Sequence, residues 1–186
     1  MTGLYIVTRF ITFFGTSLRV FWEHVACRIC KIPIEDTRAF RTNESCGHIE
    51  HELADNLNQS FVICWLPFTM NFLIGCSLLL TGAYRLFYIY ETDYIPNYFL
   101  VWLGFSCIAN CSSSFEDALL LRDYLLKEKG KFKKIIMAPF FGVNYVAAMI
   151  ERYSVTTLLS LVFTVFFPQI FNLLFPLLDS IDQKLH

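Results

Sequence analysis

The side chains most suited to chemistry gather in one polar stretch of the chain, between its first two apolar segments. This stretch holds acids, histidines and thiols: Glu23, His24, Cys27, Cys30, Cys46, His48, Glu50, His51 and Glu52. Thiolates and imidazoles are good ligands for Zn²⁺, and a glutamate beside a zinc-bound water is a common general base. A metal or catalytic site is therefore expected in this stretch.

The first candidate constellation follows the first apolar segment. On a helix, Glu23, Cys27 and Cys30 share a face, and His24 lies three residues before Cys27. These side chains are suited to binding zinc, with Glu23 as the candidate catalytic base. A helix end with scattered polar residues explains the same pattern without any metal.

The second candidate is the segment 46–52, which reads Cys-Gly-His-Ile-Glu-His-Glu. In extended backbone, His48 points to one side together with the two glutamates, and His51 points to the other. Combined with the Cys-x-x-Cys pair that begins at Cys27, the Cys-x-His pair suggests a four-ligand zinc site, although its spacing fits no zinc ribbon. A solvated acidic loop around a structural glycine is the competing interpretation.

The third candidate is Asp117, which ends a run of serines and acids after a later apolar segment. A carboxylate in such a place is often a first-turn charge at a helix N-terminus. Asp117 can also be a metal ligand that packing brings to the other candidates. Ionisable groups at the edge of a membrane deserve a functional hypothesis by default.

The composition indicates what positions these residues. The chain has 186 residues, 55% of them hydrophobic and only 17% charged, with 20 phenylalanines. A soluble domain of this size cannot hide so much apolar surface, and one helical crossing of a bilayer needs about 20 apolar residues. We therefore expect an all-α polytopic membrane protein that has the lipid bilayer as a partner, with a very apolar soluble bundle as the alternative. The net charge of -1 gives no indication of a nucleic-acid partner.

Hydropathy predicts a single membrane domain over residues 1–186 with about five hydrophobic helices. These cover residues 4–22, 61–84, 98–111, 135–150 and 155–178. The polar segment 23–60 is expected to contain a small hairpin within residues 31–51, and the segment 116–134 an amphipathic helix with Ser114 as its N-cap. Glu151 and the two residues after it are expected to form a tight turn that makes the last two helices antiparallel.

The distribution of lysine and arginine predicts the orientation. The segments 23–60 and 116–134 contain four and six basic residues, whereas the loop 84–97 contains only Arg85, beside Glu91 and Asp93. Because cytoplasmic loops carry an excess of basic residues, the first two segments are expected in the cytoplasm and the loop on the other side. The N-terminal helix shows no cleavage site typical of a signal peptide and is expected to be retained.

Short motifs follow one another along most of the chain. In order they are Gly15-Thr16, Cys27, Ile32-Pro33-Ile34, Gly47-His48-Ile49-Glu50-His51-Glu52, Gln59-Ser60-Phe61, Pro67-Phe68-Thr69-Met70-Asn71, Trp102-Leu103-Gly104-Phe105-Ser106, Ser113-Ser114-Phe115-Glu116-Asp117-Ala118 and Ala138-Pro139-Phe140-Phe141. This order resembles the bacterial integral-membrane metallopeptidases related to site-2 proteases. The resemblance implies their membrane fold and a zinc site whose third ligand is Asp117.

The chain departs from this family at the decisive motif. Where the family carries His-Glu-x-x-His, counting back from Cys27, this chain reads Arg19-Val20-Phe21-Trp22-Glu23. A zinc peptidase needs two imidazoles on one helical face and a glutamate to activate water, and Arg19 would bring positive charge to the metal position. The resemblance thus implies a catalytically degenerate member without a cofactor, which binds another membrane protein or is a subunit of a membrane assembly.

Two alternatives remain open. One is an active membrane metallopeptidase whose zinc site is rearranged, with Glu23 as base and with the candidate ligands His24, His48, His51 and Asp117. The other is a small transport or assembly component unrelated to peptidases. For the degenerate form we expect a structural polar site, in which Arg19 pairs with Glu23 four residues away and donates to Asp117 in the space of the lost metal.

Overall fold

In the computed structural model, the chain is all-α apart from one small hairpin, and 80% of it is helical. The structure describes residues 3–38, 48–151 and 155–185, and within them it forms seven helices and two strands. In chain order these are α1 (Gly3–Ile11), α2 (Phe13–Cys30), β1 (Ile34–Arg38), β2 (His48–His51), α3 (Leu57–Phe87), α4 (Ile95–Ala109), α5 (Phe115–Lys127), α6 (Lys131–Glu151) and α7 (Val155–Leu185).

The first apolar segment forms two helices, which corrects the expectation of one helix over residues 4–22. The backbone breaks at Thr12, where φ is -99° and ψ is 32°. Donors from α4 and from the residue after it bind the carbonyls at the break: Trp102 Nε1 lies 3.2 Å from the Ile11 oxygen, and Asn110 Nδ2 lies 3.3 Å from that of Thr12. The Thr12 oxygen also accepts the helical hydrogen bond from the Thr16 N–H at 3.1 Å, so Asn110 is an additional donor to it. With the amphipathic α5, this break raises the expected five helices to seven.

The hairpin is confirmed, because β1 and β2 pair antiparallel with Ile34 opposite His51 and Arg38 opposite His48. Ile49 of β2 is completely buried. Cys46 and Gly47 lie outside the described residues, and for His48 only the backbone is described. The Cys-x-His half of the expected zinc site is therefore not part of the described structure.

The amphipathic helix is also confirmed. α5 begins after Ser114, whose Oγ accepts a hydrogen bond from the Asp117 N–H at 3.1 Å. This is the side-chain cap that the spacing predicts. Leu121 and Leu125 on its buried face pack against Leu57 and Cys64 of α3, which holds α5 beside the start of that helix.

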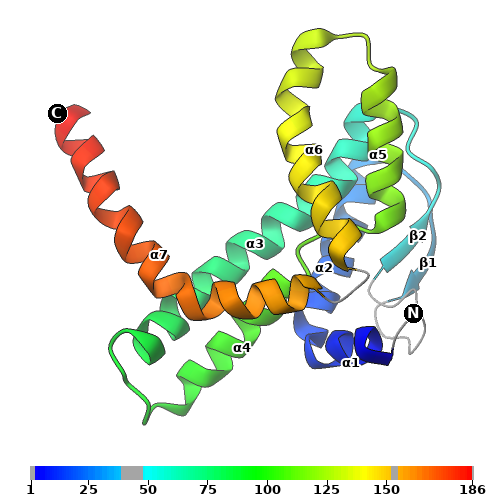
Figure 1. Cartoon of the computed structure of the whole chain (residues 1–186). Helices are drawn as coiled ribbons and strands as arrows, with labels where there is room; N and C mark the ends of the chain where they lie inside the picture. Colours follow the sequence, from blue (N-terminus) through cyan, green and yellow to red (C-terminus); the bar gives the residue numbers. More distant parts are fainter. Residues whose placement is uncertain (1–2, 39–47, 152–154, 186) are drawn as a thin grey trace.

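The last two helices do not run back along each other. In Figure 1, α7 leaves the end of α6 and crosses α3 and α4 (orange over green) instead of folding back onto α6. The reason is a shared apolar cluster, in which Phe167 of α7 packs with Leu79 and Ala83 of α3 and with Ile108 of α4. Of the turn expected at Glu151 and the two residues after it, Glu151 ends α6, and the other two residues lie outside the described residues.

Within the described residues, three helices are long and apolar enough to cross a membrane: α3, α6 and α7, the last over Val155–Leu173. The expected first and third spans are not among them. α2 carries Arg19, Glu23 and Arg28, and α4 has only 15 residues. Figure 1 places the turn between α3 and α4 at the end of this pair that is remote from α5 and β2.

Candidate functional site

One face of α2 is polar and buried. Thr12, just before the helix, is followed at steps of three or four by Thr16, Arg19 and Glu23, which places all four on the same side. The exposed fraction is 2% for Arg19 and 1% for Glu23. Buried ionised groups are stable only when they are paired and hydrogen-bonded, so the partners of these two side chains define the site.

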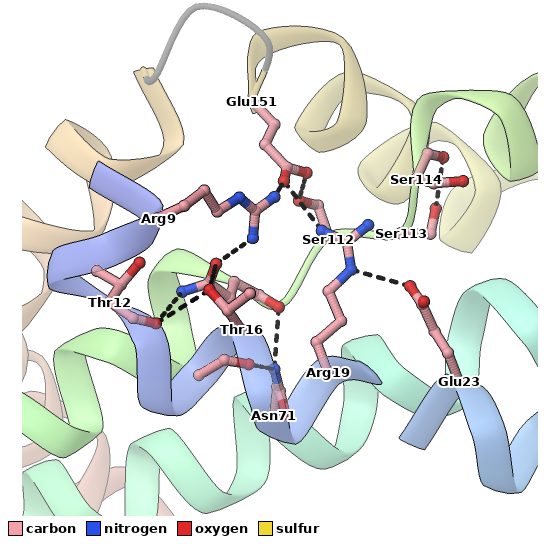
Figure 2. Close-up of polar contacts among 12 residues, drawn as sticks. Arg9, Thr12, Thr16, Arg19, Glu23, Asn71, Ser112, Ser113, Ser114 and Glu151 are labelled. Atoms are coloured by element: carbon pink, nitrogen blue, oxygen red, sulfur yellow. Dashed lines mark hydrogen bonds and ion pairs between the residues drawn. The ribbon is translucent and has the colours of Figure 1, made fainter. Parts of the chain in front are cut away.

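Arg19 joins two carboxylates (Figure 2). Its Nε lies 2.9 Å from Oε1 of Glu23, and its Nη1 lies 2.9 Å from Oε1 of Glu151 at the end of α6. Arg9 of α1 also pairs with Glu151, and the Ser112 hydroxyl donates to the same carboxylate. The expected Arg19–Glu23 pair is therefore present. Sequence reasoning missed Glu151, which it assigned to a turn.

Asn110, the residue that follows α4, connects this ionic network to the helix break. Its Oδ1 accepts hydrogen bonds from Arg9 and from Thr16 Oγ1, the latter at 3.0 Å. Its Nδ2 donates to the Ser106 carbonyl at 2.7 Å, in addition to that of Thr12. Asn71 of α3 donates in turn to the carbonyls of Gly15 and Asn110 at 3.2 and 2.9 Å. Interhelical hydrogen bonding thus accounts for the burial of Asn71 and Asn110 in the helix bundle.

A second buried pair joins the hairpin to α5. His51 Nε2 lies 3.3 Å from Oδ1 of Asp117, and the Ser114 hydroxyl donates to Oδ2 of Asp117 at 2.6 Å. The backbone N–H of Ile49 donates to Glu23 at 3.2 Å, so β2 also reaches the ionic network on α2. Two candidate metal ligands, His51 and Asp117, are therefore adjacent in space.

His51 carries a proton on both ring nitrogens. Its Nδ1 lies 2.7 Å from the Glu52 carbonyl oxygen and its Nε2 faces the Asp117 carboxylate, and a neutral imidazole has only one donor for these two acceptors. The hydrogen bond to Asp117 raises the pKa of His51 from 6.5 to about 9, against the effect of burial, and the negative charges of Asp117 and Glu23 act in the same direction. The imidazolium and Asp117 form a buried ion pair at neutral pH.

The other candidates do not complete a metal site. His24 is half-buried on α2, and Cys27 is fully buried; burial, together with the negative charge of Glu23, raises the pKa of this thiol to about 12. A thiol with such a pKa stays protonated at neutral pH and is a poor ligand or nucleophile. In the part of the chain that the structure describes, no three His, Cys, Asp or Glu side chains converge as a metal group requires.

The zinc that the family resemblance implies does not fit these residues. Both nitrogens of His51 face oxygen acceptors, so a metal at His51 would have to displace a proton and the contact with Asp117 or Glu52. The guanidinium of Arg19 lies between Glu23 and Glu151 and pairs with both carboxylates, and its positive charge would repel a metal cation bound there. Comparison of the chain with protein-family models, with curated protein sequences and with solved structures finds no match.

The His51–Asp117 pair makes a prediction for the pH dependence of stability. The pKa of His51 is about 9 in the folded chain, against the ordinary histidine pKa of 6.5, so the folded state holds its proton more tightly. The contribution of the pair is complete below pH 6.5 and disappears as the pH rises through 9. The shift corresponds to about 3 kcal/mol of unfolding free energy. Unfolding in mixed micelles, followed by circular dichroism between these pH values, measures this loss.

The control for this prediction is His51→Gln, which keeps a polar side chain that does not titrate. Its unfolding free energy should start lower at pH 6 and should change far less up to pH 9. An equally steep decline in this variant would assign the pH dependence to other groups.

Proposed function

We propose that this chain is a multi-pass membrane protein of site-2-protease-like ancestry, in which ion pairs occupy the place of the zinc centre. In this role it does not cleave peptides but binds another membrane protein, or serves as a subunit of a membrane assembly. The observation that carries the proposal is the position of Arg19. In the resemblance to these peptidases, Arg19 corresponds to the first histidine of their His-Glu-x-x-His motif. Its guanidinium binds Glu23 and Glu151.

The charge balance of the buried residues supports this proposal. The positive charges of Arg9 and Arg19 balance the negative charges of Glu23 and Glu151, with which they form ion pairs. The charge of protonated His51 balances that of Asp117. Ionised side chains in a membrane protein are retained when they pair with one another within the helix bundle. A neutral, hydrogen-bonded cluster of this kind is a stable end state for a site that has lost its metal ligands.

The active-enzyme alternative has one observation in its favour, the adjacency of His51 and Asp117. Zinc binding distinguishes the two proposals. We expect the chain, purified in detergent and dialysed against zinc, to hold much less than one zinc per molecule, and a chelator to leave its unfolding temperature unchanged. Asp117→Ala should lower stability or partner binding. Stoichiometric zinc, together with chelator-sensitive cleavage that Asp117→Ala abolishes, would favour the enzyme instead.

The proposal includes an orientation, with the segments 23–60 and 116–134 in the cytoplasm. Accordingly, a cysteine engineered at Asp93 should react with a membrane-impermeant maleimide added to intact cells, because Asp93 follows the end of α3 that is remote from α5. One engineered at Lys129 should react only after the cells are opened. Labelling of the parent chain measures the background reaction of its native cysteines. Labelling at Lys129 but not at Asp93 in intact cells would mean that the orientation is the opposite one.

A further inference from the structure

The connection from the end of α5 through the first turn of α6 is rich in lysine. Residues 127–134 read Lys-Glu-Lys-Gly-Lys-Phe-Lys-Lys, with five lysines and a single acid. Oε1 of that acid, Glu128, accepts a hydrogen bond from the Gly130 N–H at 3.0 Å and so helps to form the turn itself. We call residues 127–134 the lysine-rich turn.

The lysine-rich turn is open to its surroundings. Lys127, Lys129 and Lys131 are exposed, and the exposed fraction of Phe132 between them and the following lysines is 79%. In Figure 1 the turn lies at the tip of the α5–α6 pair, remote from α4. The turn thus presents positive charge and one aromatic side chain together.

An apolar face of α6 begins directly after these lysines. Large apolar side chains are exposed along it at Ile135, Ile136, Phe140, Val143 and Val146. α6 is also one of the helices long and apolar enough to span a membrane. A helix that enters the hydrocarbon at Ile135 places the lysine-rich turn at the level of the headgroups, where long lysine side chains keep their ammonium groups in the polar layer.

We propose that the lysine-rich turn binds the anionic phospholipid headgroups of the leaflet that α6 enters, an inference that rests on the proposed membrane function. The attraction of each lysine to an anionic surface adds to that of its neighbours and acts within a Debye length, about 10 Å at 0.1 M salt. Phe132 inserts at the boundary between headgroups and acyl chains, as the apolar side chains of interfacial basic segments do. The turn thereby fixes the depth at which α6 enters the bilayer.

The test uses the full chain in vesicles of dioleoylphosphatidylcholine with a trace of spin-labelled lipid. Electron paramagnetic resonance measures the fraction of label that the protein restricts, for phosphatidylglycerol and for phosphatidylcholine separately. We expect phosphatidylglycerol to be preferred about two- to threefold, and the preference to disappear in about 1 M NaCl. It should also disappear in the triple variant Lys127→Gln, Lys129→Gln, Lys131→Gln.

The matched control removes three basic charges elsewhere, by Arg28→Gln, Lys31→Gln and Arg85→Gln, all of them exposed. This variant should keep the preference. Equal restriction of the two lipids by the parent chain, or the same loss in the control variant, would overturn the inference. So would displacement of phosphatidylglycerol by inorganic phosphate or a single-stranded oligonucleotide at matched ionic strength. Absence of any restricted phosphatidylcholine would instead contradict the membrane function itself.

Discussion

Replacing Arg19 with methionine should lower the free energy of unfolding by about 3–5 kcal/mol, as expected when one partner of a buried ion pair is removed. Glu23 would lose its guanidinium donor, and Glu151 would lose one of the two arginines that bind it. Methionine has a similar length and stays apolar, so the loss reports the charge more than a cavity. Unfolding of the purified chain in mixed micelles of increasing sodium dodecyl sulfate measures the difference.

A second variant keeps this prediction informative if the first folds poorly. In the double variant Arg19→Met, Glu23→Gln, the carboxylate that lost its partner is neutral, so part of the loss should be recovered. The matched control is Arg122→Ala, because Arg122 also pairs with a neighbouring acid, Asp123, but at the surface of α5. This control should leave unfolding unchanged. Additive losses for Arg19 and Glu23 would show that the two side chains do not act as a pair.

The expected hydrogen bond from Arg19 to Asp117 is a separate question. The described hydrogen bonds of Arg19 go to Glu23 and Glu151, and Asp117 binds His51 and Ser114. Coupling between Arg19 and Asp117 therefore stays a prediction. The double variant Arg19→Ala, Asp117→Asn tests it, with recovery of part of the single-variant loss as the expected sign of contact.

The features that the sequence predicted well depend on neighbours close along the chain. The Ser114 cap of α5 needs only a donor three residues away, and the Arg19–Glu23 pair needs only helical spacing. The hairpin likewise follows from a local pattern of extended residues and turn signals. Such features form wherever the segment is helical or extended, whatever the rest of the fold does.

The features that the sequence did not predict depend on partners far along the chain. Glu151 looked like a turn residue, yet it lies against Arg19, 132 positions earlier. The helix break at Thr12 is likewise accompanied by two distant donors, Trp102 of α4 and Asn110 just after it. A hydropathy pattern contains no information about which polar side chains of different helices will meet, so these contacts needed a three-dimensional structure.

The close approach of α2 and α4 leads to the other large expected effect, at Gly15. Its N–H donates to Ser106 Oγ at 2.8 Å, and a Cβ at this position would lie 1.9 Å from the Ser106 carbonyl oxygen. That atom belongs to the backbone of α4 and cannot rotate away as a side chain can. Gly15→Ala should therefore push the two helices apart and destabilise the chain by about 3 kcal/mol or more.

Separation of the helices at Gly15 should also weaken the polar network, because the Gly15 carbonyl is an acceptor for Asn71 and Thr16 beside it binds Asn110. The matched control is Gly142→Ala on α6, where a Cβ would meet no atom within 4 Å. There the higher helix propensity of alanine should stabilise the chain by up to about 1 kcal/mol. Both unfolding free energies are measured in the same micelles. A decrease for Gly15→Ala together with an increase for Gly142→Ala would attribute the loss at Gly15 to the contact between α2 and α4. A stable Gly15→Ala variant would mean that the two helices do not approach each other this closely.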